Sequence, residues 1–106
     1  MTNQLVLVGK IANKTKLVED ENNRKIMTIT IAVPRITKNE KGEYDTDFLE
    51  VRLYGGIAEN ADNYLEIGSL VGVRGRLARL ENEILQIVAE RVTYLSSKGE
   101  VKNEDW

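Results

Sequence analysis

The sequence of 106 residues contains no cysteine and no histidine. Without cysteine, the chain has no disulfide and no thiolate to bind a metal. Without histidine, it lacks the commonest general base and the commonest metal-binding side chain. Catalysis would have to rely on carboxylates, lysine or tyrosine. We therefore expect a protein that is not an enzyme and that holds no metal and no cofactor.

Long apolar runs are missing as well. No run approaches the roughly 20 residues that a membrane-spanning helix requires, and the first strand-like segment begins almost at Met1, which leaves no room for a signal peptide. Hydrophobic residues make up 42% of the chain and charged residues 30%, which is typical of one soluble globular domain. We expect no membrane association and a cytoplasmic location.

The sequence also has no excess of basic residues, since its formal net charge is −2. Residues 1–98 contain 14 Lys and Arg against 14 Asp and Glu, whereas residues 99–106 contain one Lys against three acids. This balance argues against a simple polybasic nucleic-acid-binding protein, although charge alone decides nothing. A neutral body can still carry a basic groove if its acids lie elsewhere.

The most informative stretch is Asp47–Gly55, which alternates strictly between apolar and other residues. In a strand, alternate side chains point to opposite faces, so Leu49, Val51 and Leu53 are predicted to face the core. The opposite face carries Phe48, Glu50, Arg52 and Tyr54. Two aromatic rings with an arginine between them suit the stacking of bases and contact with phosphates. The alternative is that a subunit interface buries the two rings.

Four further strands and one helix are predicted from hydrophobic periodicity. Leu5–Gly9 is expected to be buried on both faces, with another subunit as one possible cover for its outer face. The helix is expected to end before a capping Gly68 and to place Tyr64 in the core. The second strand is predicted at residues 24–33 and the helix at 57–67. The two later strands are predicted at 70–78 and 84–95.

Two polar connections flank the second strand. Glu19–Asn23 is predicted to be an acidic, solvated turn. Pro34 is expected to end the strand, because proline cannot donate to a sheet ladder. Residues 35–46 are then predicted to form a polar flap that carries Arg35 and Lys38, with a turn at Lys41-Gly42.

The order of three strands, one helix and two strands predicts an all-β fold, a five-stranded OB-fold Greek-key barrel with the helix between strands three and four. The domain is expected to span residues 1–97, followed by a short acidic tail at 98–106. On the fourth strand, Arg74 and Arg76 share one face. They are interpreted either as further groove residues or as two solvated arginines.

Several segments together resemble bacterial single-stranded DNA-binding proteins in one register over residues 3–95. The segments are Gln4–Lys10, Ile29–Val33, Gly42–Phe48, Ala58–Ala61 and Asn63–Leu77. The resemblance implies an OB-fold homotetramer that binds single-stranded DNA with little sequence preference, associates with the nucleoid and serves replication, recombination or repair. It places Phe48 and Tyr54 at two base-stacking positions. The basic residues expected to contact phosphates are Arg52, Arg74, Arg76, Arg35 and Lys38.

Three departures from that family accompany the resemblance. The connection around Arg35–Lys38 has no aromatic residue, and the hairpin at Leu80–Ile84 is short and also lacks one. Each missing ring forgoes about 1–3 kcal/mol of stacking, which predicts weaker binding or a smaller site. The chain stops at Glu104-Asp105-Trp106 without a long Gly/Pro/Gln-rich tail, so recruitment of replication proteins through such a tail is in doubt.

Three other interpretations remain open. A primosomal replication protein of the short OB type would act as a dimer that bridges single strands and partner proteins. A metal-dependent enzyme would use Glu43, Asp45 and Asp47 as ligands for phosphodiester chemistry. An interaction module would be recognised by a partner through Trp106. The alternative is that Trp106 belongs to a disordered chain end.

Overall fold

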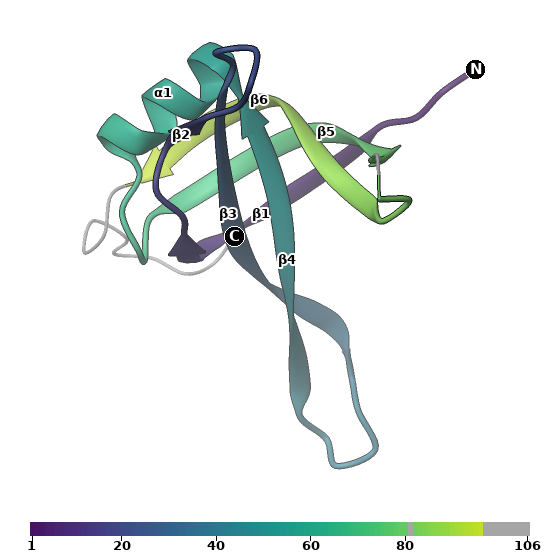
Figure 1. Ribbon diagram of the computed structural model, residues 1–106. Coiled ribbons are helices and arrows are strands. Elements are labelled where there is room, and N and C mark those ends of the chain that lie inside the picture. Colours follow the sequence, from purple (N-terminus) through teal and green to yellow (C-terminus); the bar gives the residue numbers. More distant parts are fainter. Residues whose placement is uncertain (81, 97–106) are drawn as a thin grey trace.

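A closed barrel of five long strands, with one helix across an end, forms the described part of the computed structural model, residues 1–80 and 82–96 (Figure 1). The helix follows the third long strand and precedes the fourth, as predicted. The predicted tail at 98–106, its boundary at residue 97 and Trp106 lie outside the described residues. The elements are β1 Leu5–Lys14, β2 Val18–Glu19, β3 Lys25–Lys38, β4 Tyr44–Tyr54, α1 Gly55–Tyr64, β5 Leu70–Arg79 and β6 Leu85–Ser96.

The strand order is β1-β5-β6-β4-β3-β2, and an additional β1–β3 pairing closes the barrel. The β4–β6 pairing is parallel, through Val51 opposite Ile87 and Arg52 opposite Val88, whereas the other pairings are antiparallel. This topology confirms the five-stranded Greek-key barrel. The parallel pair is the one departure from an antiparallel arrangement among the described strands.

The core follows the predicted alternation of β4. Val51 and Leu53 are fully buried and Leu49 is half-buried, whereas Phe48 on the opposite face is 66% exposed. Each buried side chain of β4 meets a buried residue of β3, as Val51 meets Ile29. Burying such a side chain contributes roughly 1.5–3 kcal/mol. The other fully buried large side chains are Ile11, Met27, Ile31, Leu65, Val71 and Val73.

Pro34 does not end its strand, so that prediction was wrong. β3 continues to Lys38, with Pro34 opposite Thr46 and an irregular register between Pro34 and Lys38. The pairing of β3 with β1 stops at Ala32, so β3 is an edge strand beyond that point. An edge strand tolerates a residue that lacks an N–H.

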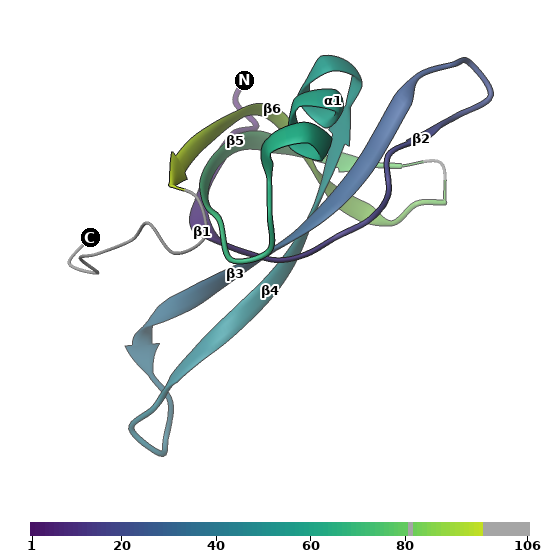
Figure 2. The same cartoon turned by 90° about the vertical axis from the view of Figure 1, so that its left-hand side faces the viewer.

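The predicted flap is a twisted hairpin that projects from the barrel (Figures 1 and 2). We call residues 35–46 the arm. Its turn is held by the Asn39 side-chain oxygen, which accepts hydrogen bonds from the backbone N–H of Lys41 at 2.8 Å and of Glu43 at 3.0 Å. Gly42 has the positive φ of 78° that such a turn requires. The turn prediction at Lys41-Gly42 is confirmed, although its surroundings are strand.

The helix ends earlier than predicted. Leu65 is the C-cap, and Gly68 lies in the following turn, where its N–H donates to the carbonyl of Ile11 at 2.8 Å. Leu65 fills the core, and Tyr64 is 69% exposed and meets Tyr94 edge-to-face. The expectations of a capping Gly68 and a buried Tyr64 were therefore wrong. At ten residues, this helix is also too short to cross a membrane, and no other described segment forms a spanning helix.

β1 is buried on one face only. Gly9 and Ile11 point inward, whereas Val6 is 67% exposed and Val8 is also exposed. Val8 and Leu95 both approach Gly72 on the outside of the barrel. The prediction that both faces are buried fails for the single chain, which carries an outward apolar strip formed by Val6, Val8 and Leu95.

Candidate nucleic-acid interface

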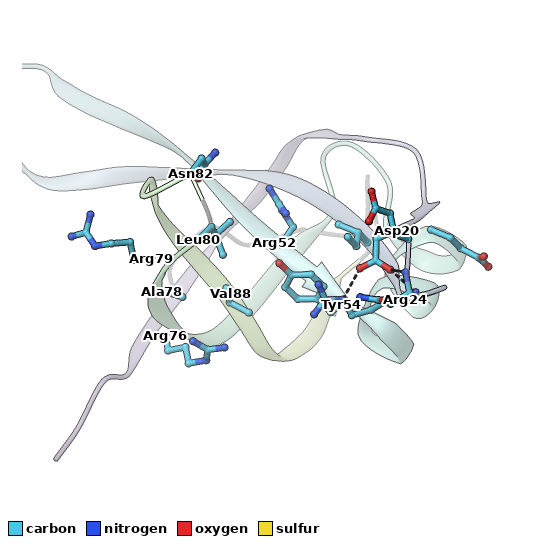
Figure 3. A pocket seen from close by; sticks show the side chains of 14 residues that line it. Asp20, Arg24, Arg52, Tyr54, Arg76, Ala78, Arg79, Leu80, Asn82 and Val88 are labelled. Carbon is cyan, nitrogen blue, oxygen red and sulfur yellow. Dashed lines mark hydrogen bonds and ion pairs between the residues drawn. The ribbon is translucent and has the colours of Figure 1, made fainter.

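A groove with a volume of about 990 Å³ runs over the outer surface of the barrel, between the β2–β3 turn and the β5–β6 hairpin (Figure 3). Its floor comes from the outward-facing side chains of β3, β4, β5 and β6. The described residues that line it are Glu19, Asp20, Glu21, Asn22, Arg24, Ile26, Arg52, Tyr54, Arg76, Ala78, Arg79, Leu80, Asn82 and Val88.

Strand register brings two of the predicted arginines together in this groove. Arg52 on β4 lies opposite Val88 on β6, and Val88 lies opposite Arg76 on β5. The Nε atom of Arg52 is buried and donates no hydrogen bond to any of the described residues. A buried donor without an acceptor costs about 1–3 kcal/mol. Because this atom is buried, an anion in the groove supplies the missing acceptor only after the Arg52 side chain turns toward it.

Tyr54 lies in the same groove but is partly covered. The guanidinium carbon of Arg24 is 4.4 Å from the centre of the Tyr54 ring, which is the geometry of a cation–π contact. Arg24 is held there by Asp20, whose Oδ2 accepts from the Arg24 Nε at 3.0 Å (Figure 3). One face of the Tyr54 ring therefore carries a guanidinium.

The β2–β3 turn is built around the Asp20 carboxylate. Its Oδ1 accepts hydrogen bonds from the backbone N–H of Arg24 at 2.8 Å and of Asn22 at 2.9 Å. The hydrogen bond from the Arg24 backbone is the main cause that lowers the pKa of Asp20 below its ordinary value. Asn23 adopts the left-handed conformation with φ of 59°. The predicted acidic turn is present, but it forms a wall of the groove.

Phe48 shares the outward face of β4 with Arg52 and Tyr54 but lies outside the groove, toward the arm. Its register partner on β3 is the small residue Ala32, which leaves the ring open to solvent. Phe48 and the groove residues Arg52 and Tyr54 therefore lie along one face of β4, with the exposed Glu50 between Phe48 and Arg52.

The other predicted basic residues lie outside the groove. Arg74 is opposite Val6 and Arg91, on the side of the barrel that carries the outward apolar strip. On the arm, Arg35 makes a two-pronged ion pair with Asp47, whose shortest contact is 3.0 Å, and this pair lowers the pKa of Asp47. Lys38 lies over the ring of Tyr44 at 5.7 Å.

Seven polar residues of the groove were not among the predicted site residues: Glu19, Asp20, Glu21 and Asn22 on the β2–β3 side, and Arg24, Arg79 and Asn82. Arg24 and Arg79 add two positive charges, and Asn82 lies at the β5–β6 hairpin. The Nη1 of Arg79 donates to the backbone oxygen of Glu83 at 2.9 Å. The four arginines of the groove are opposed by three acids on the β2–β3 side. Arg79 lies three residues after Arg76, so strict alternation places it on the other face of β5, and the pattern gave no signal for it.

Two of the three acids proposed as metal ligands are otherwise engaged. Asp47 is paired with Arg35, and Asp45 accepts a hydrogen bond from the Asn39 side chain at 3.1 Å. Across residues 1–80 and 82–96, no three carboxylates gather closely enough to hold a metal ion.

The barrel and its outward strip of aromatic rings and arginines define the class of OB-fold binding proteins. The model of the "Single-strand binding protein family" matches residues 2–96. The chain belongs to this family, as the resemblance indicated.

Similar proteins agree with this assignment. "Single-stranded DNA-binding protein 2" of Staphylococcus aureus is 37% identical, with 93% of this chain and 76% of that protein covered. "Single-stranded DNA-binding protein A" of Bacillus subtilis is 36% identical, with 93% and 62% covered. Among solved structures, the protein priB of Ralstonia solanacearum is similar, with a TM-score of 0.73, 15% identity, and 90% and 99% covered. At that identity the likeness shows the fold alone, and the OB-fold prediction is confirmed.

Proposed function

We propose that this chain binds single-stranded DNA with little sequence preference and is not an enzyme. Unpaired bases stack on Phe48 and Tyr54, and Arg52 and Arg76 contact the phosphates. The observation that carries the proposal is the outward face of β4 on a closed barrel, which presents in turn Phe48, Glu50, Arg52 and Tyr54, so that an arginine lies between an exposed ring and a second ring. Membership of the single-strand binding protein family supports it.

An exposed Phe48 supports the stacking role because a ring in water gains by covering its faces. Stacking of one base contributes roughly 1–3 kcal/mol. Arg52 supports the phosphate role because its buried Nε lacks an acceptor among the described residues. Charge-assisted hydrogen bonds to phosphate are stronger than those between neutral groups.

The two rings are not equivalent. A base reaches the covered face of Tyr54 only after Arg24 moves aside, and the lost cation–π contact, about 0.5–1 kcal/mol at an exposed site, offsets part of the stacking gain. Among the described residues, no cation lies over the ring of Phe48, which is 66% exposed. We therefore expect Phe48 to contribute more to binding than Tyr54.

The remaining predicted contacts are secondary in the proposal. Arg35 has to exchange Asp47 for a phosphate, and Arg74 is reached only by a strand that continues around the barrel past Arg76. Lys38 has no carboxylate within 4 Å among the described residues and is available without such an exchange.

The assembly is proposed to be a homotetramer, with a dimer as the alternative. The outward apolar strip of Val6, Val8 and Leu95 supports a subunit contact, because exposed apolar patches of this kind commonly mark interfaces. The dimeric primosomal reading is supported at the level of fold only, whereas the sequence similarity favours the single-stranded DNA-binding proteins. A measurement of molecular mass in solution distinguishes the two states, because the tetramer has twice the mass of the dimer.

The biological setting follows from this activity. Single-stranded DNA arises in replication, recombination and repair, so we infer a role in organising or protecting it there. A cytoplasmic location at the nucleoid belongs to the same proposal. Replication proteins are further candidate partners.

The test is the double variant Phe48→Ala/Tyr54→Ala in a titration against fluorescently labelled oligo-dT. Loss of two platforms is expected to weaken binding by about 2–6 kcal/mol, roughly 30-fold or more. Tyr64→Ala is the matched control, since Tyr64 is equally exposed but lies on α1, away from the groove. A folded double variant that binds as tightly as the parent chain would refute the stacking role.

Salt dependence tests the arginines in the same assay. Each phosphate contact on a single strand contributes a slope of about −0.7 in log K against log salt. If the binding constant does not change with salt concentration, the arginines do not contact phosphates. Magnesium-dependent cleavage of the labelled strand would instead favour the enzyme interpretation.

A further inference from the structure

The arm carries one more aromatic ring on the face that holds Phe48 and Tyr54. Tyr44 is the first residue of β4, and strand alternation places it on the same side of β4 as those two rings. Its side chain is 57% exposed, close to the value for Phe48. Tyr44 and Phe48 are four positions apart, a distance of about 13 Å along a strand.

The surroundings of Tyr44 are basic on the side that faces its ring. Its register partner is Lys38, whose Nζ is 5.7 Å from the ring centre. Within residues 1–80 and 82–96, no carboxylate lies within 4 Å of this nitrogen. Of the acids near Tyr44, Asp45 is engaged with Asn39 and Asp47 with Arg35, and neither Glu40 nor Glu43 forms an ion pair with Lys38. A phosphate near Tyr44 therefore meets an uncommitted ammonium group.

The ring of Tyr44 is also easier to reach than that of Tyr54. The cation over Tyr54 is 4.4 Å away and tied to Asp20, whereas the cation over Tyr44 is close to the outer limit of about 6 Å for such contacts and has no carboxylate holding it. Lys38 can move to a phosphate without breaking an ion pair. The ring then offers its face to a base.

The arm holds this ring in a defined place. The Asn39 side chain fixes the turn, the backbone N–H of Asn39 donates to Glu43, and the Arg35–Asp47 pair ties the two strands at the base of the arm. A ring that is already positioned loses little conformational freedom when a base stacks on it.

We propose that Tyr44 is a third base-stacking platform and that Lys38 supplies a phosphate contact beside it. The ligand is the continuation of the same single strand that crosses Phe48. This inference rests on the proposed function and extends the binding surface along the arm. Only strands long enough to span the barrel and the arm reach this platform.

The experiment compares Tyr44→Leu, Tyr44→Phe and the parent chain with labelled oligo-dT of roughly 6 and roughly 20 nucleotides, one near the lower end of the usual site of one OB-fold, about 4–16 nucleotides, and one above it. For the long strand, Tyr44→Leu is expected to weaken binding at least about fivefold. For the short strand, binding is expected to be unchanged. Tyr44→Phe keeps the ring and is expected to bind like the parent chain.

Two controls isolate the ring from the arm. Ile36→Ala removes an exposed apolar side chain from the same hairpin and is expected to leave binding of both strands unchanged. Lys38→Gln is expected to reduce the salt slope for the long strand by about 0.7, the contribution of one phosphate. Circular dichroism of each variant verifies that the barrel is folded.

The outcomes separate this inference from the proposed function. If the parent chain binds neither strand, the proposed function fails. If the parent chain binds but Tyr44→Leu binds the long strand equally well, or loses the same factor for both lengths, the third platform is refuted. Photocrosslinking of an iodouracil-substituted long strand is expected to label Tyr44, and a crosslinked complex without label on the arm overturns the inference.

Discussion

Asp20 illustrates how single side chains shape this surface. Its carboxylate accepts two backbone N–H groups and the Arg24 guanidinium, and it thereby fixes the turn that places a cation on Tyr54. Strand alternation in β4 predicted that Tyr54 faces outward, because alternation is a local property. The cover over its ring depends on a residue 30 positions earlier in the chain, which no local pattern indicates.

The pKa of Asp20 provides a test at this scale. The backbone hydrogen bond from Arg24 is the largest cause of the lowered pKa, so NMR titration is expected to place it below the ordinary value of 3.8. Arg24→Gln keeps the backbone donor, and the pKa is expected to stay low in this variant. If Arg24→Gln restores the ordinary value, the guanidinium and not the backbone holds the turn.

The sign of the accompanying stability change follows from the same shift. A carboxyl whose pKa is lower in the folded state stabilises the fold above its unfolded pKa, and this contribution is lost as the pH falls through the folded value. Asp47, lowered by Arg35, behaves in the same way. Unfolding by urea is therefore expected to become easier below about pH 4.

Among the elements, β5 shows where a residue pattern stops being sufficient. Arg74 and Arg76 are both exposed on either side of the buried Gly75, so they share the predicted outward face, but the register of β5 against β6 shifts between Arg74 and Gly75. Such an irregularity increases the local twist and re-aims the side chains that follow. Arg76 consequently lines the groove and Arg74 does not. The bulge depends on pairing with β6, which the sequence of β5 alone does not specify.

Gly75 allows this bend, because a methyl group at its Cα would collide with the backbone oxygen of Val88. Gly75→Ala is expected to destabilise the protein by about 1–3 kcal/mol in urea unfolding, the usual cost of overpacking. Gly56→Ala is the matched control. Nothing lies within 4 Å of its added methyl, and a helical Gly-to-Ala change is neutral or stabilising by up to about 1 kcal/mol. Equal stability of Gly75→Ala and the parent chain would contradict the close approach.

The other misplaced boundaries have similar causes. Pro34 was predicted to end its strand because proline cannot donate to a sheet ladder. It is tolerated because β3 is an edge strand there, and the local sequence does not show that the pairing with β1 stops at Ala32. The helix was extended past Leu65 because Tyr64, Leu65 and Ile67 all suit an apolar face, and only the packed core selects Leu65. The turns were predicted best, because Gly42 and Asn23 both adopt a positive φ, which these residue types tolerate whatever their tertiary surroundings.

At the scale of the whole molecule, the barrel separates two outward surfaces. One is the strip along β4 that continues into the arm, and the other is the apolar strip on β1 and β6. The fold and the face of β4 were predictable from periodicity and from the family resemblance. The groove itself was only partly predictable, because its walls come from the β2–β3 turn and the β5–β6 hairpin, which meet only when the barrel closes.

The most direct measurement of the central claim is a titration of the chain against labelled oligo-dT and, separately, against a duplex of the same length. The label is on the DNA because the sole tryptophan, Trp106, lies outside the described residues. Bases that are paired and stacked in a duplex cannot cover Phe48 and Tyr54. We expect the single strand to bind at least about 30-fold more tightly, the loss expected from two stacking platforms. Equal affinity for the two forms would contradict the claim that the outward face of β4 receives unpaired bases.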